Sequence, residues 1–228
     1  MNHLKAFYVK YRHAIPAVLY GIIYLAWFCY LEKTVTKQYT VIHMEIDDYI
    51  PFCEIFVIPY MLWFAYIAVV LVYFFFKDKT DYYKLCIFLA TGMTIFLIIS
   101  TLWPNGHHLR LEEFPRDNIF TQMVASLWKT DTPTNLWPSI HVYNSIGAHL
   151  AIAKSKHFAD KKGIRIASFI LATSIILATV FIKQHSVFDV LTAFALSVIM
   201  YLVTYRSDLF LAIKHSLRRD RDSRTQIG

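Results

Sequence analysis

Long apolar runs alternate with short polar connections along this chain. A helix needs about 20 apolar residues, within a range of about 17–25, to cross the hydrocarbon core of a bilayer. Four runs meet that requirement: Ile15–Leu31, Ile55–Phe76, Leu85–Trp103 and Ile166–Ile182. A fifth, Val187–Tyr205, carries one acidic residue, Asp189, near its start. The pattern predicts five transmembrane helices.

A sixth segment, Ser139–Ala153, is shorter and more polar, and it includes His141, Asn144 and His149. Polar side chains inside a membrane face the interior of a helix bundle and not lipid. We therefore expect an all-α integral membrane bundle of about six transmembrane helices. Residues 1–228 form a single domain in this interpretation, with a cytoplasmic tail from about residue 206.

Composition supports the membrane assignment. Hydrophobic residues make up 57% of the chain and charged residues 17%, against about 45–50% and about 25% in soluble domains. The net charge is +7, but the basic residues cluster in particular connections. In a membrane protein such clusters indicate which connections lie in the cytoplasm. We therefore expect membrane lipids as partners and no nucleic acid.

The distribution of basic residues predicts the topology. Of the 23 lysines and arginines, 17 lie in the N-terminal segment, the second and fourth connections, and the tail. The remaining six are Lys33, Lys37, Arg110, Arg116, Lys129 and Lys183. The positive-inside rule then predicts a multi-pass protein of the cell membrane with both termini in the cytoplasm.

Two outer connections differ in character. Glu32–Ile50 is acidic, and we expect a solvated link. Pro104–Trp137 is long and rich in polar residues, and loops of this length are usually functional or disordered. Within it, His107 and His108 are typical of a loop surface, whereas His149 in the sixth helix is typical of structural packing.

Three polar clusters fall at the same predicted membrane face. They are Pro104–Asn118, Trp137–His141 and Lys183–Asp189. His185 and Asp189 are four residues apart, so a helix places both on one side. A carboxylate beside an imidazole keeps one ring nitrogen protonated and leaves the other free as a nucleophile. We take His185, Asp189 and His141, a possible acid, as catalytic candidates.

The same clusters suit a phosphate group. Pro138 is favourable in the first turn of a helix, and the amides of a first turn attract anions. Ser139 adds a hydroxyl group, while Arg110, Arg116 and Lys183 add cations suited to a phosphoryl group and its transition state. We take these four as candidate phosphate ligands.

These residues resemble a known family. Pro138-Ser139-Ile140-His141, followed by His185-x-x-x-Asp189, is similar to motifs two and three of the type 2 phosphatidic acid phosphatase superfamily. The resemblance covers most of the chain, including the six-helix layout. It implies that His185 forms a phosphohistidine, that Asp189 orients His185, and that His141 protonates the leaving group. The implied activity is hydrolysis of a lipid phosphomonoester or diphosphate with no cofactor and no metal ion. The predicted topology places this activity at the extracytoplasmic face.

The chain departs from the family pattern at several positions. Arg110, or else Arg116, stands for the arginine of motif one, but Leu111 replaces the proline and Trp103 the lysine. Ala178-Thr179 occupies the Ser-Arg positions of motif three. These variant motifs resemble the branch that contains inositol-phosphorylceramide synthases.

Several alternatives stay open from the sequence. A lipid phosphotransferase would use the same intermediate but transfer the phosphoryl group to an alcohol. A metal- or haem-binding protein would use the histidines as ligands, although their spacing fits no standard pattern. A transporter would carry paired broken helices. No recognisable sequence pattern identifies the lipid substrate or the oligomeric state.

Overall fold

The computed structural model describes residues 11–35 and 38–206, so the predicted tail beyond about residue 206 lies outside the described residues. The elements are η1 (Arg12–Ala14), α2 (Ile15–Thr34), β1 (Thr40–Val41), α3 (Glu45–Tyr49), η2 (Glu54–Phe56), α4 (Val57–Lys77), α5 (Lys79–Leu102), β2 (Asn105–Gly106), α6 (Ile119–Thr130), α7 (Ile140–Lys154), η3 (Lys156–Phe158), α8 (Lys162–Phe181), α9 (Val187–Tyr201) and η4 (Leu202–Arg206).

The prediction of an all-α membrane bundle is confirmed. Five helices are long and apolar enough to cross a membrane: Arg12–Thr34, Glu54–Lys77, Lys79–Leu102, Lys162–Phe181 and Val187–Arg206. Their bounds exceed several of the predicted apolar runs because the helices continue into polar and aromatic residues at their ends. Large apolar side chains on their outer faces are exposed, as expected for helices surrounded by lipid.

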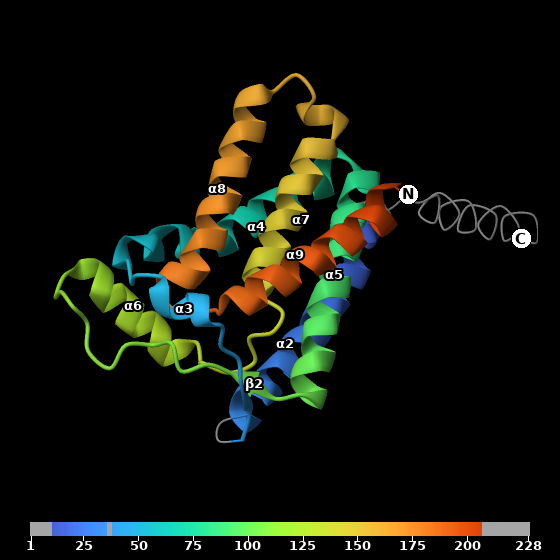
Figure 1. Cartoon of the computed structure of the whole chain (residues 1–228). Coiled ribbons are helices and arrows are strands. Elements are labelled where there is room, and N and C mark those ends of the chain that lie inside the picture. The colour runs from blue at the N-terminus through green and yellow to red at the C-terminus, as the bar shows by residue number, and fades with distance from the viewer. Residues whose placement is uncertain (1–10, 36–37, 207–228) are drawn as a thin grey trace, which may run out of the picture.

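The short polar helix α7 lies at the centre of the bundle, as predicted. It contacts α4, α5, α8 and α9 (Figure 1). Small residues permit this close packing: a Cβ added at Gly147 would lie 2.6 Å from the ring of Phe88, and one at Gly92 of α5 would lie 2.0 Å from Tyr143. The centre of the bundle is therefore packed around α7.

The long connection Pro104–Trp137 is ordered. Asn118 caps α6 by accepting hydrogen bonds from the amides of Phe120 and Thr121. The short strand β2 pairs in parallel with β1. In Figure 1, α3, α6 and β2 lie at one end of the bundle, and the turn from α7 to α8 lies at the other.

The interpretation of Glu32–Ile50 as only a solvated link is wrong. Asp47 is 2% exposed. Its carboxylate accepts hydrogen bonds from the Ser186 hydroxyl group and, at 2.8 Å, from the Val187 amide. An acceptor at a helix N-terminus satisfies otherwise unpaired amides and complements the helix dipole. The first outer connection therefore stabilises the start of α9.

Candidate active site

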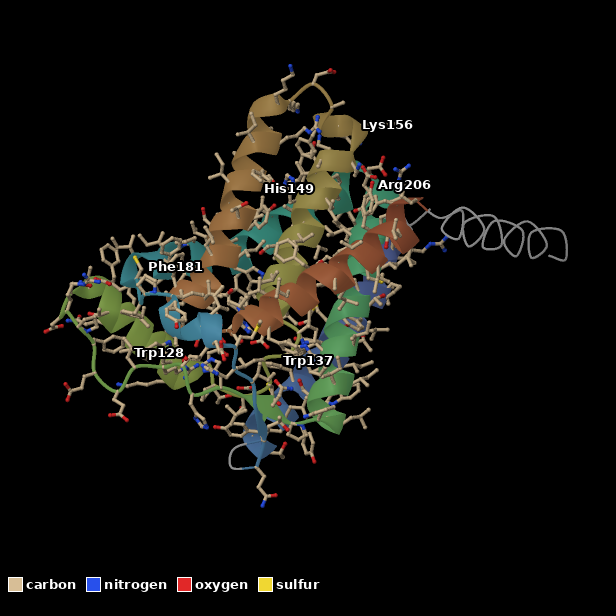
Figure 2. The ribbon with its side chains drawn as sticks, in the orientation of Figure 1. Trp128, Trp137, His149, Lys156, Phe181 and Arg206 are labelled. Atoms are coloured by element: carbon tan, nitrogen blue, oxygen red, sulfur yellow. The ribbon has the colours of Figure 1, made fainter. Side chains whose placement is uncertain are left out.

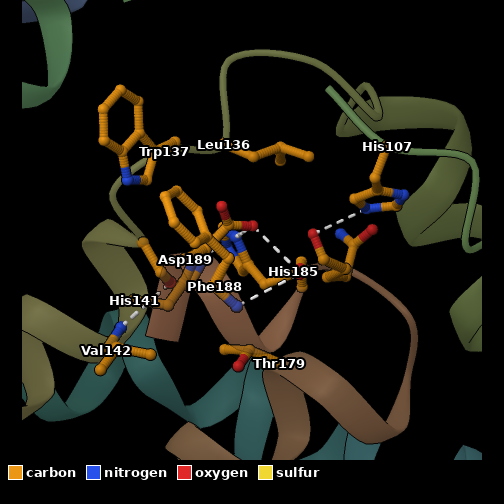
Figure 3. Close-up of polar contacts among 12 residues, drawn as sticks. His107, Leu136, Trp137, His141, Val142, Thr179, His185, Phe188 and Asp189 are labelled. Atoms are coloured by element: carbon orange, nitrogen blue, oxygen red, sulfur yellow. Dashed lines mark hydrogen bonds and ion pairs between the residues drawn. The ribbon is translucent and has the colours of Figure 1, made fainter. Parts of the chain in front are cut away.

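The structure brings the three predicted catalytic residues together at the loop-covered end of the bundle (Figure 3). His185 Nδ1 lies 3.3 Å from Asp189 Oδ2, and His185 Nε2 lies 3.5 Å from His141 Nδ1. His185 is supplied by the short connection between α8 and α9, and His141 by the first turn of α7. One imidazole is therefore placed between a carboxylate and a second imidazole.

Local backbone contacts fix the position of His185. Its amide donates to the Thr179 carbonyl of α8 at 2.9 Å. Asp189 Oδ2 also accepts from the Ser186 amide at 3.0 Å, which completes a capping box at the start of α9. Asp189 is fully buried, and its Oδ1 has no hydrogen-bond partner among the described residues. The capping hydrogen bond at the start of α9 therefore keeps the Asp189 carboxylate close to His185.

Burial keeps His185 neutral. The side chain is 4% exposed, and desolvation, followed by the Arg110 charge, lowers the pKa of His185 to about 3. A neutral imidazole that donates from Nδ1 to Asp189 carries its lone pair on Nε2. That nitrogen is the nucleophilic atom that the arrangement makes available.

Aromatic rings enclose His141. Its ring centroid lies 4.6 Å from that of Tyr60 and 4.3 Å from that of Trp63. Both aromatic residues belong to α4. These two ring contacts fix the orientation of the His141 imidazole next to His185.

A polar network links Tyr60 to Arg110. Tyr60 donates to Asp131 Oδ2 at 3.0 Å, and Gln184 donates to the same oxygen at 2.8 Å. Gln184 Oε1 in turn accepts from Arg110 at 2.6 Å. Burial raises the pKa of Asp131 to about 6. The sequence interpretation missed Tyr60, Asp131 and Gln184, because residues 60, 131 and 184 converge only in the fold.

Arg110 is the predicted phosphate ligand best placed for the site. It donates to the carbonyls of Trp128 and Asp131 at the C-terminal end of α6. Its guanidinium also lies 5.5 Å from the centre of the Trp128 ring. Arg110 Nε is buried and has no partner among the described residues. One donor is therefore still available to a ligand.

The other three predicted phosphate ligands make structural contacts. Ser139 is fully buried, and its Oγ accepts from the Val142 amide at 3.4 Å, which caps α7. Arg116 pairs with Glu54 through both Nε and Nη2 at 2.8 Å. Lys183 donates to the carbonyls of Asp47 and Ile50 at 2.8 and 2.6 Å. Arg110 therefore differs from Ser139, Arg116 and Lys183 in keeping a buried donor without a partner.

The interpretation of His107 as a loop-surface residue is wrong, because the side chain is 1% exposed. Its Nδ1 accepts from the Leu109 amide, so Nε2 carries the hydrogen and donates to the Gln184 carbonyl at 3.0 Å. Burial lowers the pKa of His107 to about 4. His107 holds the backbone next to the candidate nucleophile, whereas His108 is exposed.

The loop before α7 covers the site. Asn105 Oδ1 accepts from the amides of Leu136 and Trp137 at 2.8 and 3.0 Å. The Trp137 ring packs 5.6 Å from that of Phe188, and Leu136 is 6% exposed (Figure 3). Gly106 permits this close approach, since a Cβ there would lie 2.5 Å from the Pro133 carbonyl oxygen.

Histidine, cysteine and acidic side chains in residues 11–35 and 38–206 form no group of three or more that could hold a metal ion.

Comparison with known proteins finds no matching family model, no matching curated protein and no matching solved structure.

Proposed function

We propose that this chain is a membrane lipid phosphatase that hydrolyses a phosphomonoester or diphosphate through a phosphohistidine on His185. The contact of His185 with both Asp189 and His141, at 3.3 and 3.5 Å, carries the proposal. It joins a nucleophile, an orienting carboxylate and a second imidazole at one end of an apolar helix bundle. A substrate with a phosphate head group and an apolar tail fits that position.

The reaction has two steps. His185 Nε2 attacks phosphorus, the bond to the leaving oxygen breaks, and protonated His141 gives that oxygen a proton. Water then attacks the phosphohistidine, the N–P bond breaks, and His141 takes a proton from the water. Asp189 stabilises the positive charge on the phosphorylated imidazole. The substrate must first separate the two rings, because 3.5 Å leaves no room for a phosphoryl group.

Arg110 is the proposed donor to the transferred phosphoryl group through its buried Nε. The structural contacts of Ser139, Arg116 and Lys183 make them weaker candidates for direct binding. They would act by holding α7, the loop before α6, and the connection after α8. Hydrogen-bond donors that already have the right position stabilise the negative charge that develops in the transition state, because they need not move during the reaction.

The proposed site faces outward, with both termini in the cytoplasm, because 17 of the 23 basic residues fall in the segments assigned to the cytoplasm. Single cysteines introduced at His108 and Lys156, in a variant whose Cys29, Cys53 and Cys86 are replaced by alanine, provide the test on intact cells. Figure 2 places Lys156 at the opposite end of the molecule from Trp128 and Trp137. An impermeant reagent should label only position 108, and labelling of position 156 alone would reverse the orientation.

A phosphate-release assay tests the activity itself. The purified protein in detergent should release phosphate from one or more of a panel of lipid phosphates, with EDTA present. Release that begins only when an alcohol acceptor is added would instead indicate a phosphotransferase. Reversible loss of activity with the chelator would contradict the metal-independent reaction.

A further inference from the structure

A large apolar groove adjoins the candidate active site. It encloses about 510 Å³ between α2, α4 and α5, with Trp63 and Asn144 among its lining residues. Pockets for small ligands typically enclose about 300–1,000 Å³. Trp63 also packs against His141, so one side chain forms a wall of both the groove and the site.

Two buried polar atoms in this lining have no hydrogen-bond partner among the described residues. They are the Nε1 donor of Trp63 and the Oδ1 acceptor of Asn144, whose residues are 7% and 2% exposed. Asn144 lies one helical turn beyond His141 on α7. Buried polar groups without partners are unfavourable and rare. An unpaired donor on Trp63 and an unpaired acceptor on Asn144, both in the lining of one groove, together match a ligand hydroxyl group.

The groove extends away from the site along α4. It is lined from Trp63 to Leu71, a separation of about 12 Å at the rise of an α-helix. The groove continues to Leu71 and to Tyr82 near the start of α5. A lipid with its phosphate at His185 would therefore extend one chain past Trp63 toward the opposite end of α4.

We propose that this groove binds one hydrocarbon chain of the substrate lipid, and that Trp63 and Asn144 bind a hydroxyl group next to its head group. The proposal rests on the proposed lipid-phosphate chemistry and names the class of substrate. That class is a lipid phosphate with a long chain and a hydroxyl group close to the phosphate.

Gly21 allows the groove to be blocked without disturbing the protein. It lines the groove, and a Cβ added there meets no atom within 4 Å. Gly163 in α8 is equally open but is not among the residues that line the groove. The variants Gly21→Leu and Gly163→Leu are therefore a matched pair, both favourable for helix propensity.

The kinetic test uses tetradecyl phosphate and butyl phosphate. Gly21→Leu should raise KM for tetradecyl phosphate by about tenfold or more, and leave KM for butyl phosphate unchanged. Gly163→Leu should alter neither value. An equal change for both substrates in Gly21→Leu, or no change for either, would overturn the assignment of the groove.

The hydroxyl test uses a tetradecyl phosphate that carries a hydroxyl group beside the head group, and the methyl ether of that hydroxyl. The wild-type protein should prefer the hydroxyl form by about threefold to tenfold in kcat/KM. Asn144→Leu should abolish that preference. An unchanged preference in Asn144→Leu would remove Asn144 from the site.

A binding test separates the groove from the chemistry. An alkyl phosphonate with a photoreactive chain end cannot be hydrolysed, so its attachment reports binding alone. It should label peptides of α2, α4 or α5 in the wild-type protein and in Gly163→Leu, and much less in Gly21→Leu. Labelling without any phosphate release would contradict the proposed function but support the groove, whereas labelling elsewhere would overturn the groove.

Discussion

His141 and His149 lie two turns apart on α7 but have different surroundings. His141 is enclosed by Tyr60 and Trp63 and faces His185. His149 forms a 3.1 Å hydrogen bond with the Ser168 hydroxyl group and packs against Phe169.

The cations near each histidine also differ. The partly buried Arg110 is close enough to His185 to lower its pKa. His149 instead lines a cavity of about 300 Å³ together with Lys162 and Arg165, which are both exposed. Figure 2 places His149 on the side of the molecule that carries Lys156. Two histidines on one helix thus differ in chemistry because His185 with its carboxylate partner, the rings of Tyr60 and Trp63, and the partly buried Arg110 gather only around His141.

The largest expected effect separates the two histidine environments directly. His185→Ala should lower phosphate release by about 10⁴–10⁶-fold, as loss of a nucleophile does in other enzymes. His149→Ala should stay within about threefold of wild type, since Ser168 is its polar contact. Phosphate release from the best lipid phosphate measures both. Comparable losses in the two variants would remove the distinction between the two environments.

Asp189→Asn tests the carboxylate that the His149 environment lacks. The amide would keep the size of the side chain but no longer favour the Nδ1–H tautomer of His185, so turnover should fall by about 10³–10⁴-fold. Circular dichroism should show an unchanged helix content. A folded Asp189→Asn protein with wild-type turnover would exclude Asp189 as the orienting group.

The buried and exposed cations provide a third contrast. Arg110→Lys should lower kcat by about 100–1000-fold, because lysine keeps a charge but cannot reproduce the guanidinium donors. Arg165→Lys, at the other end of the bundle, should have no measurable effect on kcat. Thermal unfolding of both variants controls for the contacts of Arg110 with α6. Equal kcat values in the two variants would strike Arg110 from the site.

The smallest expected effect concerns the network behind Tyr60. The pKa of Asp131 in the folded protein, about 6, lies above its unfolded value of about 3.9. The protonated carboxyl therefore stabilises the fold fully below about pH 4, and this contribution is lost between about pH 4 and 6. Melting temperature measured from pH 4 to 7 should fall less in Asp131→Asn than in wild type. Parallel profiles would contradict a raised pKa.

Local patterns predicted much of this molecule. The apolar runs indicated five long helices, and the polar composition of Ser139–Ala153 indicated a central one. The four-residue spacing of His185 and Asp189 brought both to one side of the α9 N-terminus. The convergence of His141 and His185 followed from their assignment to the same membrane face.

The contacts made by the loops could not be predicted from local sequence patterns. The contacts of Asp47 with Val187 and of Tyr60 with Asp131 join residues 140 and 71 positions apart, so no periodicity indicates them. Lys183 has a left-handed backbone, with φ of 56°, and its side chain contacts the carbonyls of Asp47 and Ile50, which local spacing does not indicate. One signal was present: Asn118 precedes apolar residues at helical spacing, which is typical of the capped amphipathic helix found as α6.

The most direct measurement of the central claim is acid-labile phosphate on the protein after rapid quenching with a labelled lipid phosphate. We expect label on the wild-type chain within a single turnover, stable to base and lost in acid, and mapped to the peptide containing His185. His185→Ala should trap none, while His149→Ala should trap as much as wild type. Label retained in His185→Ala, or turnover by the wild type with no trapped phosphate, would contradict the phosphohistidine mechanism.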